Sequence, residues 1–372
     1  MMELRKIVAL WREQAGASDR AVLVTLVAVE GSSYRLPGAR LLLTGDGRVA
    51  GTISGGCLEA DVVRRALWLT RDGPAVERYT MAFDDTAEIP FGLGCGGTID
   101  LLFEPLSSPE GAALLKAMQT SLHGGSAMVV HYLPGDGRGL RRLILDGEGE
   151  VVFSSAALSP DKIVCGRGLE PERQYPGRFV ERLTPPQRLM IFGAGDDARP
   201  LAKMAAGMGW TVVVADGRTH LARAERFPPA EEVVLLNGSN DPALHVDDAV
   251  VLMTHSYEQD RNLLKKVLAA SPRYVGLLGS RQRSSLLVSE VAEALGRSVV
   301  ECCARLYAPV GLDLGGDGPE AIALSIVSEI QAVCHGREGK IARLNALEIA
   351  RHVEQGGAER YQRPECALNA SA

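Results

Sequence analysis

The chain has 372 residues, of which 46% are hydrophobic and 23% charged. This length and apolar content predict a globular protein of about two domains. Forty Lys and Arg residues against 46 Asp and Glu residues give a net charge of −6, without a dense basic run, so we expect no nucleic-acid partner. No apolar stretch reaches the roughly 18 residues of a membrane span, and the first residues do not resemble a targeting peptide. We therefore expect a cytoplasmic protein without membrane contact.

The N-terminal part of the chain predicts a mixed α+β domain with strand hairpins. Residues 3–16 have the apolar spacing of a helix, and residues 21–30 are rich in β-branched side chains, as strands are. A Gly-Asp-Gly turn predicts a hairpin that leads into a glycine-rich segment. The remaining strands are expected at residues 40–44, 48–53, 76–81 and 98–103.

Two glycine-rich segments each present a cysteine. Residues 51–59 (GTISGGCLE) carry Cys57, and residues 94–97 (GCGG) carry Cys95. The helical period after Cys57 places this thiol at a helix N-terminus, where the dipole favours the thiolate, although Glu59 in the first turn opposes it.

The common interpretation of a free cysteine is a small buried hydrophobic residue. Glycines beside both thiols favour the other interpretation, because they leave the thiols uncovered and let a ligand approach the backbone. The glycines are Gly55, Gly56, Gly96 and Gly97. Seven cysteines without a Cys-x-x-Cys pair predict neither a disulfide framework nor a zinc site.

A later segment, residues 126–155, repeats the strand-turn-strand pattern without cysteines. We interpret it as a degenerate second copy of the hairpin unit.

A Rossmann unit is predicted after the proline-marked boundary. A strand at residues 188–192 runs into Gly193 and Gly195, a helix follows, and the next strand, residues 211–215, ends in Asp216. Strand, glycine turn, helix, strand and acid in this order are typical of dinucleotide-binding domains.

Asp196 and Asp197 follow the glycine turn, where a pyrophosphate would meet the helix N-terminus. Like charge there opposes phosphate, and the two acids can instead satisfy the helix end themselves. The fold prediction is therefore stronger than the prediction of a bound nucleotide.

Further apolar strands predict a doubly covered parallel sheet, and polar residues follow them. His255 follows one strand, and Ser280 and Arg281 follow another. Because ligands bind at the carboxyl ends of parallel strands, these residues are candidates for one crevice. His255 fits a hydrogen-bonded framework residue at least as well as a proton-transfer group, and Arg281 fits a solvated helix start as well as an anion contact. The strands are expected at residues 232–236, 249–254 and 274–278.

The end of the chain predicts one more strand and two helices. Residues 297–305, with Cys302 and Cys303, have the pattern of a buried strand. A helix begins at Pro319 and ends at Gly336, and a charged helix at about 341–354 is a candidate contact in a homodimer. The predicted domains are residues 1–183 with core motifs in 21–106, residues 184–336 with the Rossmann-like sheet, and residues 337–372 with a helix and tail.

Six motifs in order along the chain resemble the xanthine dehydrogenase accessory, or carbon-monoxide dehydrogenase accessory, family. They cover nearly the whole chain. The motifs are GSSYRLPGA at residues 31–39, GTISGGCLE at 51–59, GCGG at 94–97, FGAG at 192–195, GLLGSR at 276–281 and PVGLDLG at 309–315.

This resemblance implies a maturation factor rather than a turnover enzyme. Such a factor binds molybdenum cofactor (molybdopterin) as cargo and protects it while a cysteine desulfurase replaces an oxo ligand by sulfur. It then helps to insert the cofactor into a xanthine dehydrogenase-type molybdenum hydroxylase. Thiolates are soft ligands suited to molybdenum or a persulfide, and Ser32, Ser33 and Arg35 suit a pterin phosphate.

The candidate cofactor-binding residues combine both halves of the chain, with Cys57 and Cys95 as metal ligands. They are Cys57, Cys95, Gly55, Gly56, Ser32, Ser33, Arg35, Gly96, Gly97, Gly193, Gly195, Asp216, His255, Ser280 and Arg281.

The chain departs from the family pattern at Asp196, where a histidine is common, and at Ala321, where a second glutamate is common. Two other functions fit the residues. An NAD(P)-dependent oxidoreductase would use Asp216 on a ribose and His255 as acid or base. A thiol redox sensor would use Cys57 and Cys95.

Overall fold

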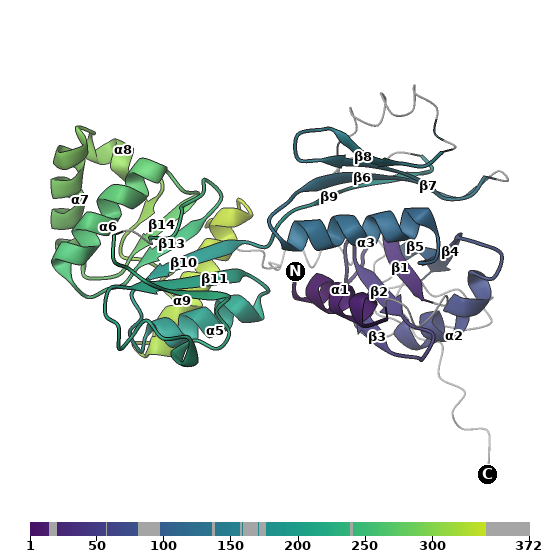
Figure 1. The fold of residues 1–372 in the computed structure, drawn as a ribbon, viewed down its shortest axis with the longest axis horizontal. Coiled ribbons are helices and arrows are strands. Elements are labelled where there is room, and N and C mark those ends of the chain that lie inside the picture. The colour runs from purple at the N-terminus through teal and green to yellow at the C-terminus, as the bar shows by residue number, and fades with distance from the viewer. Residues whose placement is uncertain are drawn as a thin grey trace, which may run out of the picture. The chain divides into compact units, whose positions relative to one another are not determined.

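The computed structural model describes residues 1–14, 21–56, 58–80, 97–135, 138–156, 158, 170, 176–238 and 241–339. The chain divides into two compact units between Pro185 and Pro186. The first unit contains two antiparallel sheets, and the second contains a parallel sheet (Figure 1). The predicted fold class, a mixed N-terminal domain followed by a Rossmann-like domain, is confirmed.

The larger sheet of the first unit has five strands in the order β3-β2-β1-β5-β4. Helix α2 covers one face, and helices α1 and α3 pack on the other. Strand β1 is therefore buried on both faces over its first six residues, as its β-branched composition predicts. The elements are α1 (Met2–Gln14), β1 (Val22–Glu30), β2 (Arg40–Leu43), β3 (Val49–Gly51), α2 (Glu59–Leu69), β4 (Ala75–Thr80) and β5 (Thr98–Pro105).

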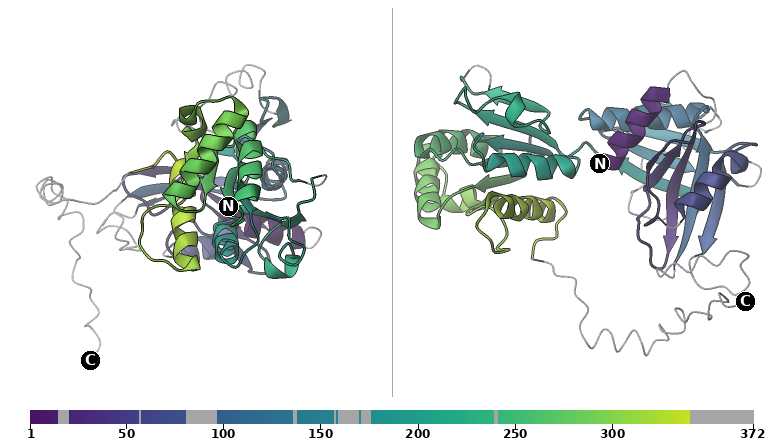
Figure 2. Two further views of the ribbon diagram at one scale, coloured as in Figure 1. Left: turned by 90° about the vertical axis from the view of Figure 1, so that its left-hand side faces the viewer. Right: turned by 90° about the horizontal axis from the view of Figure 1, so that it is seen from below.

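The smaller sheet of the first unit has four strands in the order β8-β7-β6-β9. Helix α3 lies between the two sheets, and its leucines join side chains from both in one apolar cluster (Figures 1 and 2). The helix begins after Ser108, whose hydroxyl accepts a hydrogen bond from the amide of Gly111 at 3.0 Å. The elements are α3 (Pro109–Leu122), β6 (Ala127–Tyr132), β7 (Arg141–Asp146), β8 (Val151–Ser154) and β9 (Arg178–Leu183).

The segment expected to repeat the hairpin unit forms β6, β7 and β8. In each sheet three consecutive strands form a meander, and a later strand, β5 or β9, pairs with the first of them. The two segments therefore share a strand order but lie in separate sheets, and their origin as copies stays a prediction.

The second unit has a six-stranded parallel sheet in the order β12-β11-β10-β13-β14-β15. The order changes direction between β10 and β13, which is the switch point where open α/β sheets bind ligands. The strands are β10 (Arg188–Phe192), β11 (Thr211–Asp216), β12 (Glu232–Leu235), β13 (Ala249–Leu252), β14 (Tyr274–Leu277) and β15 (Leu306–Tyr307).

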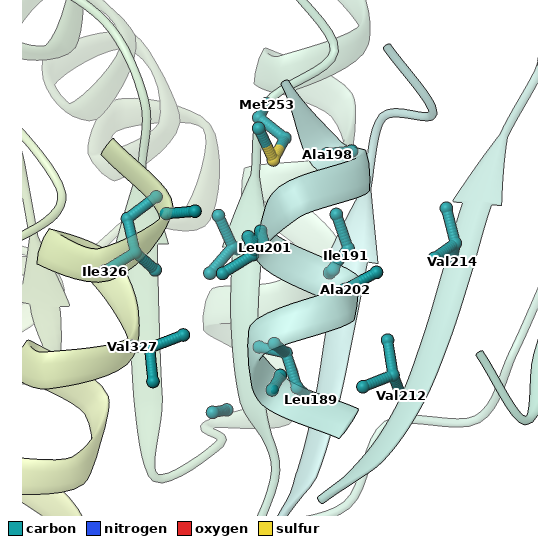
Figure 3. Close-up of a cluster of buried hydrophobic side chains, with 14 of the residues drawn as sticks. Leu189, Ile191, Ala198, Leu201, Ala202, Val212, Val214, Met253, Ile326 and Val327 are labelled. Carbon is teal, nitrogen blue, oxygen red and sulfur yellow. The ribbon is translucent and has the colours of Figure 1, made fainter. Parts of the chain in front are cut away.

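Helices cover both faces of this parallel sheet. Leu201 of α5 and Ile326 of α9 pack against Leu189 and Ile191 on one face (Figure 3), and α6 and α7 cover the other. Alternate residues of each buried strand serve the two cores, which explains the continuous apolar runs in the sequence. The helical elements are α5 (Ala198–Gly207), the short 3-10 helix η1 (Ala224–Arg226), α6 (Tyr257–Ala270), α7 (Arg281–Leu295), α8 (Val299–Cys303) and α9 (Pro319–Cys334).

The strand predicted at residues 297–305 is wrong, because Val299–Cys303 form helix α8. Ser298 and Glu301 make a capping box: the serine hydroxyl accepts from the Glu301 amide at 3.2 Å, and the carboxylate accepts from the Ser298 amide at 2.7 Å. This reciprocal cap outweighs the β propensity of two valines. The two-residue strand β15 begins just after the expected range. The helix expected at 341–354 lies outside the described residues.

Candidate functional site

The described parts of the three N-terminal motifs meet at one end of the five-stranded sheet. Strand β1 ends at Glu30, which pairs with Thr98 at the start of β5. Strand β3 runs in the same direction as β1, since both are antiparallel to β2, and it ends at Gly51. The segments after Glu30, after Gly51 and before Thr98 therefore leave the same end of the sheet.

Close backbone contacts join these segments. A Cβ atom on Gly97 would lie 2.1 Å from the carbonyl oxygen of Ser32, so only glycine fits there. A Cβ atom on Gly55 would lie 3.8 to 3.9 Å from three ring atoms of Tyr34. Gly56 has φ +105°, a conformation that glycine adopts without strain.

Cys57, Cys95 and Gly96 lie outside the described residues. The residues on both sides of Cys57 are held by one hydroxyl. The Oγ of Ser54 accepts from the amide of Gly56 at 3.3 Å and from the amide of Leu58 at 3.1 Å. The turn is therefore fixed on either side of the cysteine position.

Glu59 fixes the same turn, a role that the sequence did not indicate. Its carboxylate accepts from the amides of Ile53 at 3.2 Å and Ser54 at 2.9 Å, and from the Ser54 hydroxyl. Burial by itself would raise the pKa of Glu59, but these donors outweigh it and lower the pKa. The negative charge of Glu59 thus accepts hydrogen bonds from groups within the turn itself.

Arg35 does not meet the expectation of a free anion contact. Its guanidinium pairs with both carboxylate oxygens of Glu3 on α1 and donates to the Thr52 hydroxyl at 3.3 Å. This ion pair ties the 31–38 segment to helix α1 and neutralises the cation. Ser32 is exposed and Ser33 is half-buried, so these two hydroxyl residues stay candidates.

The predicted glycine turn of the second unit follows β10. Gly193 has φ +119°, and a Cβ atom there would lie 2.3 Å from the carbonyl oxygen of Met253. This position therefore requires glycine because two strand ends approach closely. A Cβ atom on Gly195 would lie 2.6 Å from the Oδ1 of Asp197, so a carboxylate lies against the turn.

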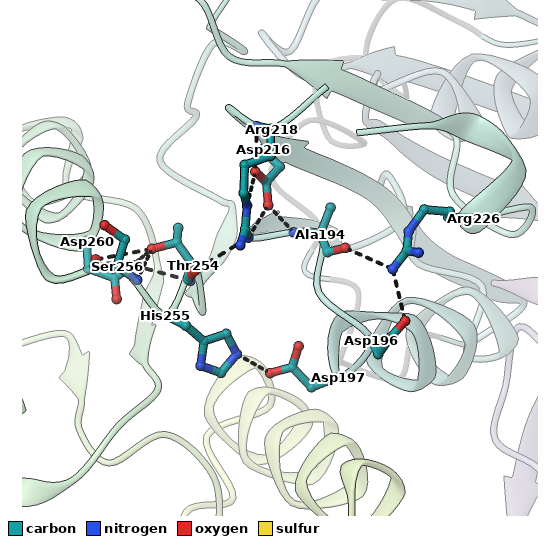
Figure 4. Close-up of polar contacts among 10 residues, drawn as sticks. All are labelled: Ala194, Asp196, Asp197, Asp216, Arg218, Arg226, Thr254, His255, Ser256 and Asp260. Carbon is teal, nitrogen blue, oxygen red and sulfur yellow. Dashed lines mark hydrogen bonds and ion pairs between the residues drawn. The ribbon is translucent and has the colours of Figure 1, made fainter. Parts of the chain in front are cut away.

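Asp216 is fully engaged within the protein. Its oxygens accept from the Ala194 amide at 2.7 Å and from three donors of Arg218, namely the amide at 2.8 Å, Nε at 2.9 Å and Nη2 at 2.7 Å (Figure 4). A carboxylate offers about four acceptor positions, so none is left for a ribose. Burial would raise the pKa of Asp216, but Arg218 and the Ala194 amide outweigh it and lower the pKa.

The two aspartates after the glycine turn have separate partners. Asp196 pairs with Arg226 at 2.9 Å, and Asp197 contacts Nε2 of His255 at 2.7 Å across the switch point between β10 and β13 (Figure 4). Both carboxylates lie where a pyrophosphate would approach helix α5, and their charge opposes it. The geometry therefore does not favour a dinucleotide in this crevice.

His255 belongs to a loop that hydrogen bonds to the buried Asp260 hold in place. Its own φ is +62°, which is uncommon for a non-glycine residue. Thr254 donates its hydroxyl to buried Asp260 at 2.7 Å, and Asp260 also accepts from Arg283 at 2.7 Å. These contacts fix the residue before His255 and leave the imidazole 59% exposed.

Ser280 and Arg281 start helix α7. The Ser280 hydroxyl accepts from the Arg283 amide at 3.3 Å and so caps the helix. Arg281 is exposed. The structure brings Arg283 rather than Arg281 to the loop of His255, through the carboxylate of Asp260.

Sequence reasoning missed the charged residues that organise both glycine turns: Glu59, Arg218 and Asp260. A partial signal existed for two of them, because Glu59 ends the motif at residues 51–59 and Arg218 lies two residues after the predicted acid, Asp216. For Asp260 there was no signal, since its partner Arg283 lies on another helix.

Two features are absent from the described part of the chain. No group of three or more His, Cys, Asp or Glu side chains there has the arrangement of a metal site. Among the helices that the structure describes, none has both the length and the hydropathy of a membrane span.

Two family models match the chain. One, described as the XdhC Rossmann domain, matches residues 189–330. The other, described as the XdhC and CoxI family, matches residues 15–80. The first covers the parallel sheet and the second covers two of the three N-terminal motifs.

Relatives match over most of their own length. A protein of Bacillus subtilis that is named as a probable xanthine dehydrogenase component is 32% identical, over 84% of this chain and 92% of that protein. The molybdenum cofactor insertion chaperone PaoD of Escherichia coli is 28% identical, over 84% and 83% of the two chains. A crystal structure of a xanthine dehydrogenase from Bacillus halodurans, 30% identical, superposes with a TM-score of 0.75 and covers 92% of this chain and 99% of that one.

Proposed function

Since the chain belongs to the XdhC and CoxI family, we propose that it is a chaperone that inserts molybdenum cofactor into a xanthine dehydrogenase-type molybdenum hydroxylase. The observation that carries this proposal is the meeting of three glycine-rich segments at one end of the five-stranded sheet. A relative named as a molybdenum cofactor insertion chaperone supports the choice of cargo.

Cys57 and Cys95 are the proposed ligands of the cargo metal. Thiolates are soft ligands that suit molybdenum. Ser54 and Glu59 hold the residues before and after position 57, which supports this turn as the place of a ligand. Two thiolates leave coordination positions open, as a protein that releases its cargo needs.

The finer proposal concerns maturation of the cofactor before insertion. The chain protects the bound cofactor while a cysteine desulfurase replaces one oxo ligand by sulfur, and a thiolate of the site is suited to carry a persulfide. We expect the chain to act as a homodimer.

The arrangement of the second unit supports a binding protein over an NAD(P)-dependent oxidoreductase. The acid that would bind the ribose, Asp216, has its acceptor positions filled by Ala194 and Arg218. Asp197 and His255 bridge the crevice that a dinucleotide would occupy. A dehydrogenase would have to break these contacts to bind its cofactor.

Anaerobic titration of the purified full chain with molybdenum cofactor tests the proposal. Cys57→Ala and Cys95→Ala should each weaken binding by at least about ten-fold, because even indirect support of a metal contributes that factor. Cys303→Ala is the matched control, since Cys303 is an exposed cysteine of the second unit. Unchanged affinity in both thiol variants would exclude ligation by these cysteines. Binding of NAD by the wild-type chain, without affinity for molybdenum cofactor, would favour the oxidoreductase.

A further inference from the structure

Tyr34 is an exposed aromatic residue within the meeting point of the three motifs. Its side chain is 71% exposed, although it belongs to the segment between β1 and β2 that also carries Ser32 and Ser33. By contrast Tyr79, on β4 of the same sheet, is only 7% exposed and packs in the core. Tyr34 therefore contributes little to the core, and another role must explain its place.

The ring of Tyr34 turns one face toward Gly55. A Cβ atom on Gly55 would be 3.8 Å from Cδ1, 3.9 Å from Cε1 and 3.9 Å from Cγ. Three ring atoms at almost equal distances place this point over the ring, because an approach at the edge would leave one atom clearly nearer. One face of the ring is therefore turned toward Gly55, with room for a Cβ atom between them, and the exposure of the side chain leaves the other face open.

The same segment is held at two further points. The carbonyl of Ser32 lies directly against Gly97, where a Cβ atom would be only 2.1 Å away. Arg35 is fixed by its ion pair with Glu3. Tyr34 therefore extends from a backbone that is anchored on both sides, so its ring is presented at a defined place at low entropic cost.

We propose that Tyr34 is the stacking platform for the pterin ring of the cargo. This inference rests on the proposed function and names the residue that recognises the organic part of the cofactor. A pterin is a flat heteroaromatic system, and such rings stack face to face with an offset on aromatic side chains. A ring with one face turned toward the protein backbone and the other face open has the geometry for this contact. Arg35, whose charge is neutralised by Glu3, does not compete for the same role.

The test compares three variants of the full chain. Tyr34→Ala removes the ring, and Tyr34→Phe keeps it without the hydroxyl. Trp68→Ala is the matched control, because Trp68 is 65% exposed in the same unit but lies near the far end of α2, about 15 Å along the helix from its start. The probes are molybdenum cofactor, in anaerobic titration, and 6-hydroxymethylpterin, whose fluorescence is quenched by stacking.

Tyr34→Ala should weaken binding of both probes by about 5- to 150-fold, the range that stacking of one base on an aromatic side chain contributes. Tyr34→Phe and Trp68→Ala should bind as the wild-type chain does. Circular dichroism should show the same fold in all variants, because both side chains are exposed.

Unchanged affinity of Tyr34→Ala for molybdenum cofactor would overturn the inference and leave the proposed function intact. Loss of binding to the target hydroxylase in this variant, with unchanged affinity for both probes, would also overturn it and assign Tyr34 to protein docking. Failure of the wild-type chain to bind molybdenum cofactor would instead contradict the proposed function.

Discussion

The two units of the protein each contain a histidine bonded to a carboxylate, in opposite environments. In the first unit, Nε2 of His131 lies 2.8 Å from Glu181, and the imidazole is fully buried. In the second, Nε2 of His255 lies 2.7 Å from Asp197, and the imidazole is 59% exposed. The two distances are nearly equal, but the two interactions differ in the free energy needed to break them and in their role.

The buried pair is part of a chain of charges that joins the two sheets of the first unit. Glu104 of β5 pairs with Arg142 of β7, which donates to Nδ1 of His131. His131 therefore carries its proton on Nε2 and donates to Glu181, which also pairs with Arg40 of β2. The chain starts and ends on the larger sheet and crosses the smaller one, so it specifies how the sheets pack.

Burial and the neighbouring charges together decide the protonation states in this chain. Burial, and then the charge of Arg142, lower the pKa of His131, so the imidazole stays neutral. Burial would raise the pKa of Glu181, but Arg40 and His131 outweigh it and lower the pKa to about 2. The two positive charges of Arg40 and Arg142 thus balance the two negative charges of Glu104 and Glu181 around a neutral histidine.

The exposed pair has water as an alternative partner. His255 and Asp197 lie at the carboxyl ends of β13 and β10, where open sheets bind ligands. Breaking this contact leaves the imidazole in water, although Asp197 itself is only 17% exposed, so it costs less than breaking the buried pair. The comparison indicates that the buried chain maintains structure, whereas the exposed pair can rearrange.

The largest expected effect comes from breaking the buried chain. Glu104→Ala leaves Arg142, which is 0% exposed, without its carboxylate. The free energy of unfolding of the first unit should fall by about 3 to 5 kcal/mol, as for a single charge stranded in a core. Urea denaturation, with hydrogen exchange of the amides in β5, β6 and β7 as the signal, measures this loss of free energy.

A matched control is Glu77→Ala, which removes a half-exposed carboxylate paired with Arg65 in the same unit. It should cost less than about 1 kcal/mol. Equal losses in the two variants would contradict the structural role given to the buried chain.

The pH dependence of stability gives an intermediate effect. The pKa of His131 is lowered in the folded state. The contribution of His131 to stability is therefore fully present above pH 6.5, the ordinary pKa of a histidine. As the pH falls below 6.5, the unfolded chain binds a proton that the folded chain does not. The first unit should then lose up to about 1.4 kcal/mol per pH unit.

Unfolding free energies between pH 7.5 and 5.5 test this in the wild-type chain and in His131→Gln, which should lack this part of the pH dependence. His255→Gln is the control, since it changes a histidine of the other unit. Parallel curves for the wild type and His131→Gln would show that His131 takes up its proton without loss of structure.

The smallest effect should come from the exposed pair. Asp197→Ala removes the partner of His255, and the free energy of unfolding of the second unit should change by less than about 1 kcal/mol. Fluorescence of Trp210, which is 7% exposed in the core of that unit, reports this unfolding. A loss as large as that of Glu104→Ala would mean that the exposed pair is also structural.

Much of the fold could be predicted from the sequence, because period and turn chemistry are local. Continuous apolar runs indicated the strands of the parallel sheet, and Gly193 with Asp216 indicated its first turn. The error at residues 297–305 arose where two local signals disagreed. The Val-Val pair favoured a strand, whereas Ser298 and Glu301 had the spacing of a capping box, and the cap prevailed.

Less of the candidate site could be predicted, because it depends on which charges become partners. The sequence placed Ser32, Gly55 and Gly97 among the candidates for one cofactor site, since each belongs to a glycine-rich motif. It did not indicate that Arg35 would be neutralised by Glu3, 32 residues earlier, or that the ring of Tyr34 would face Gly55.

The sequence by itself therefore determined the family motifs and most of the strands in their order along the chain. These properties depend on neighbouring residues and on the period of apolar side chains. Only the tertiary structure decided that Arg218 occupies acceptor positions of the Asp216 carboxylate. It also decided that Glu104, Arg142 and His131 form one buried chain of charges. The physical reason is that a charge selects its partner after packing has fixed the distances and excluded water.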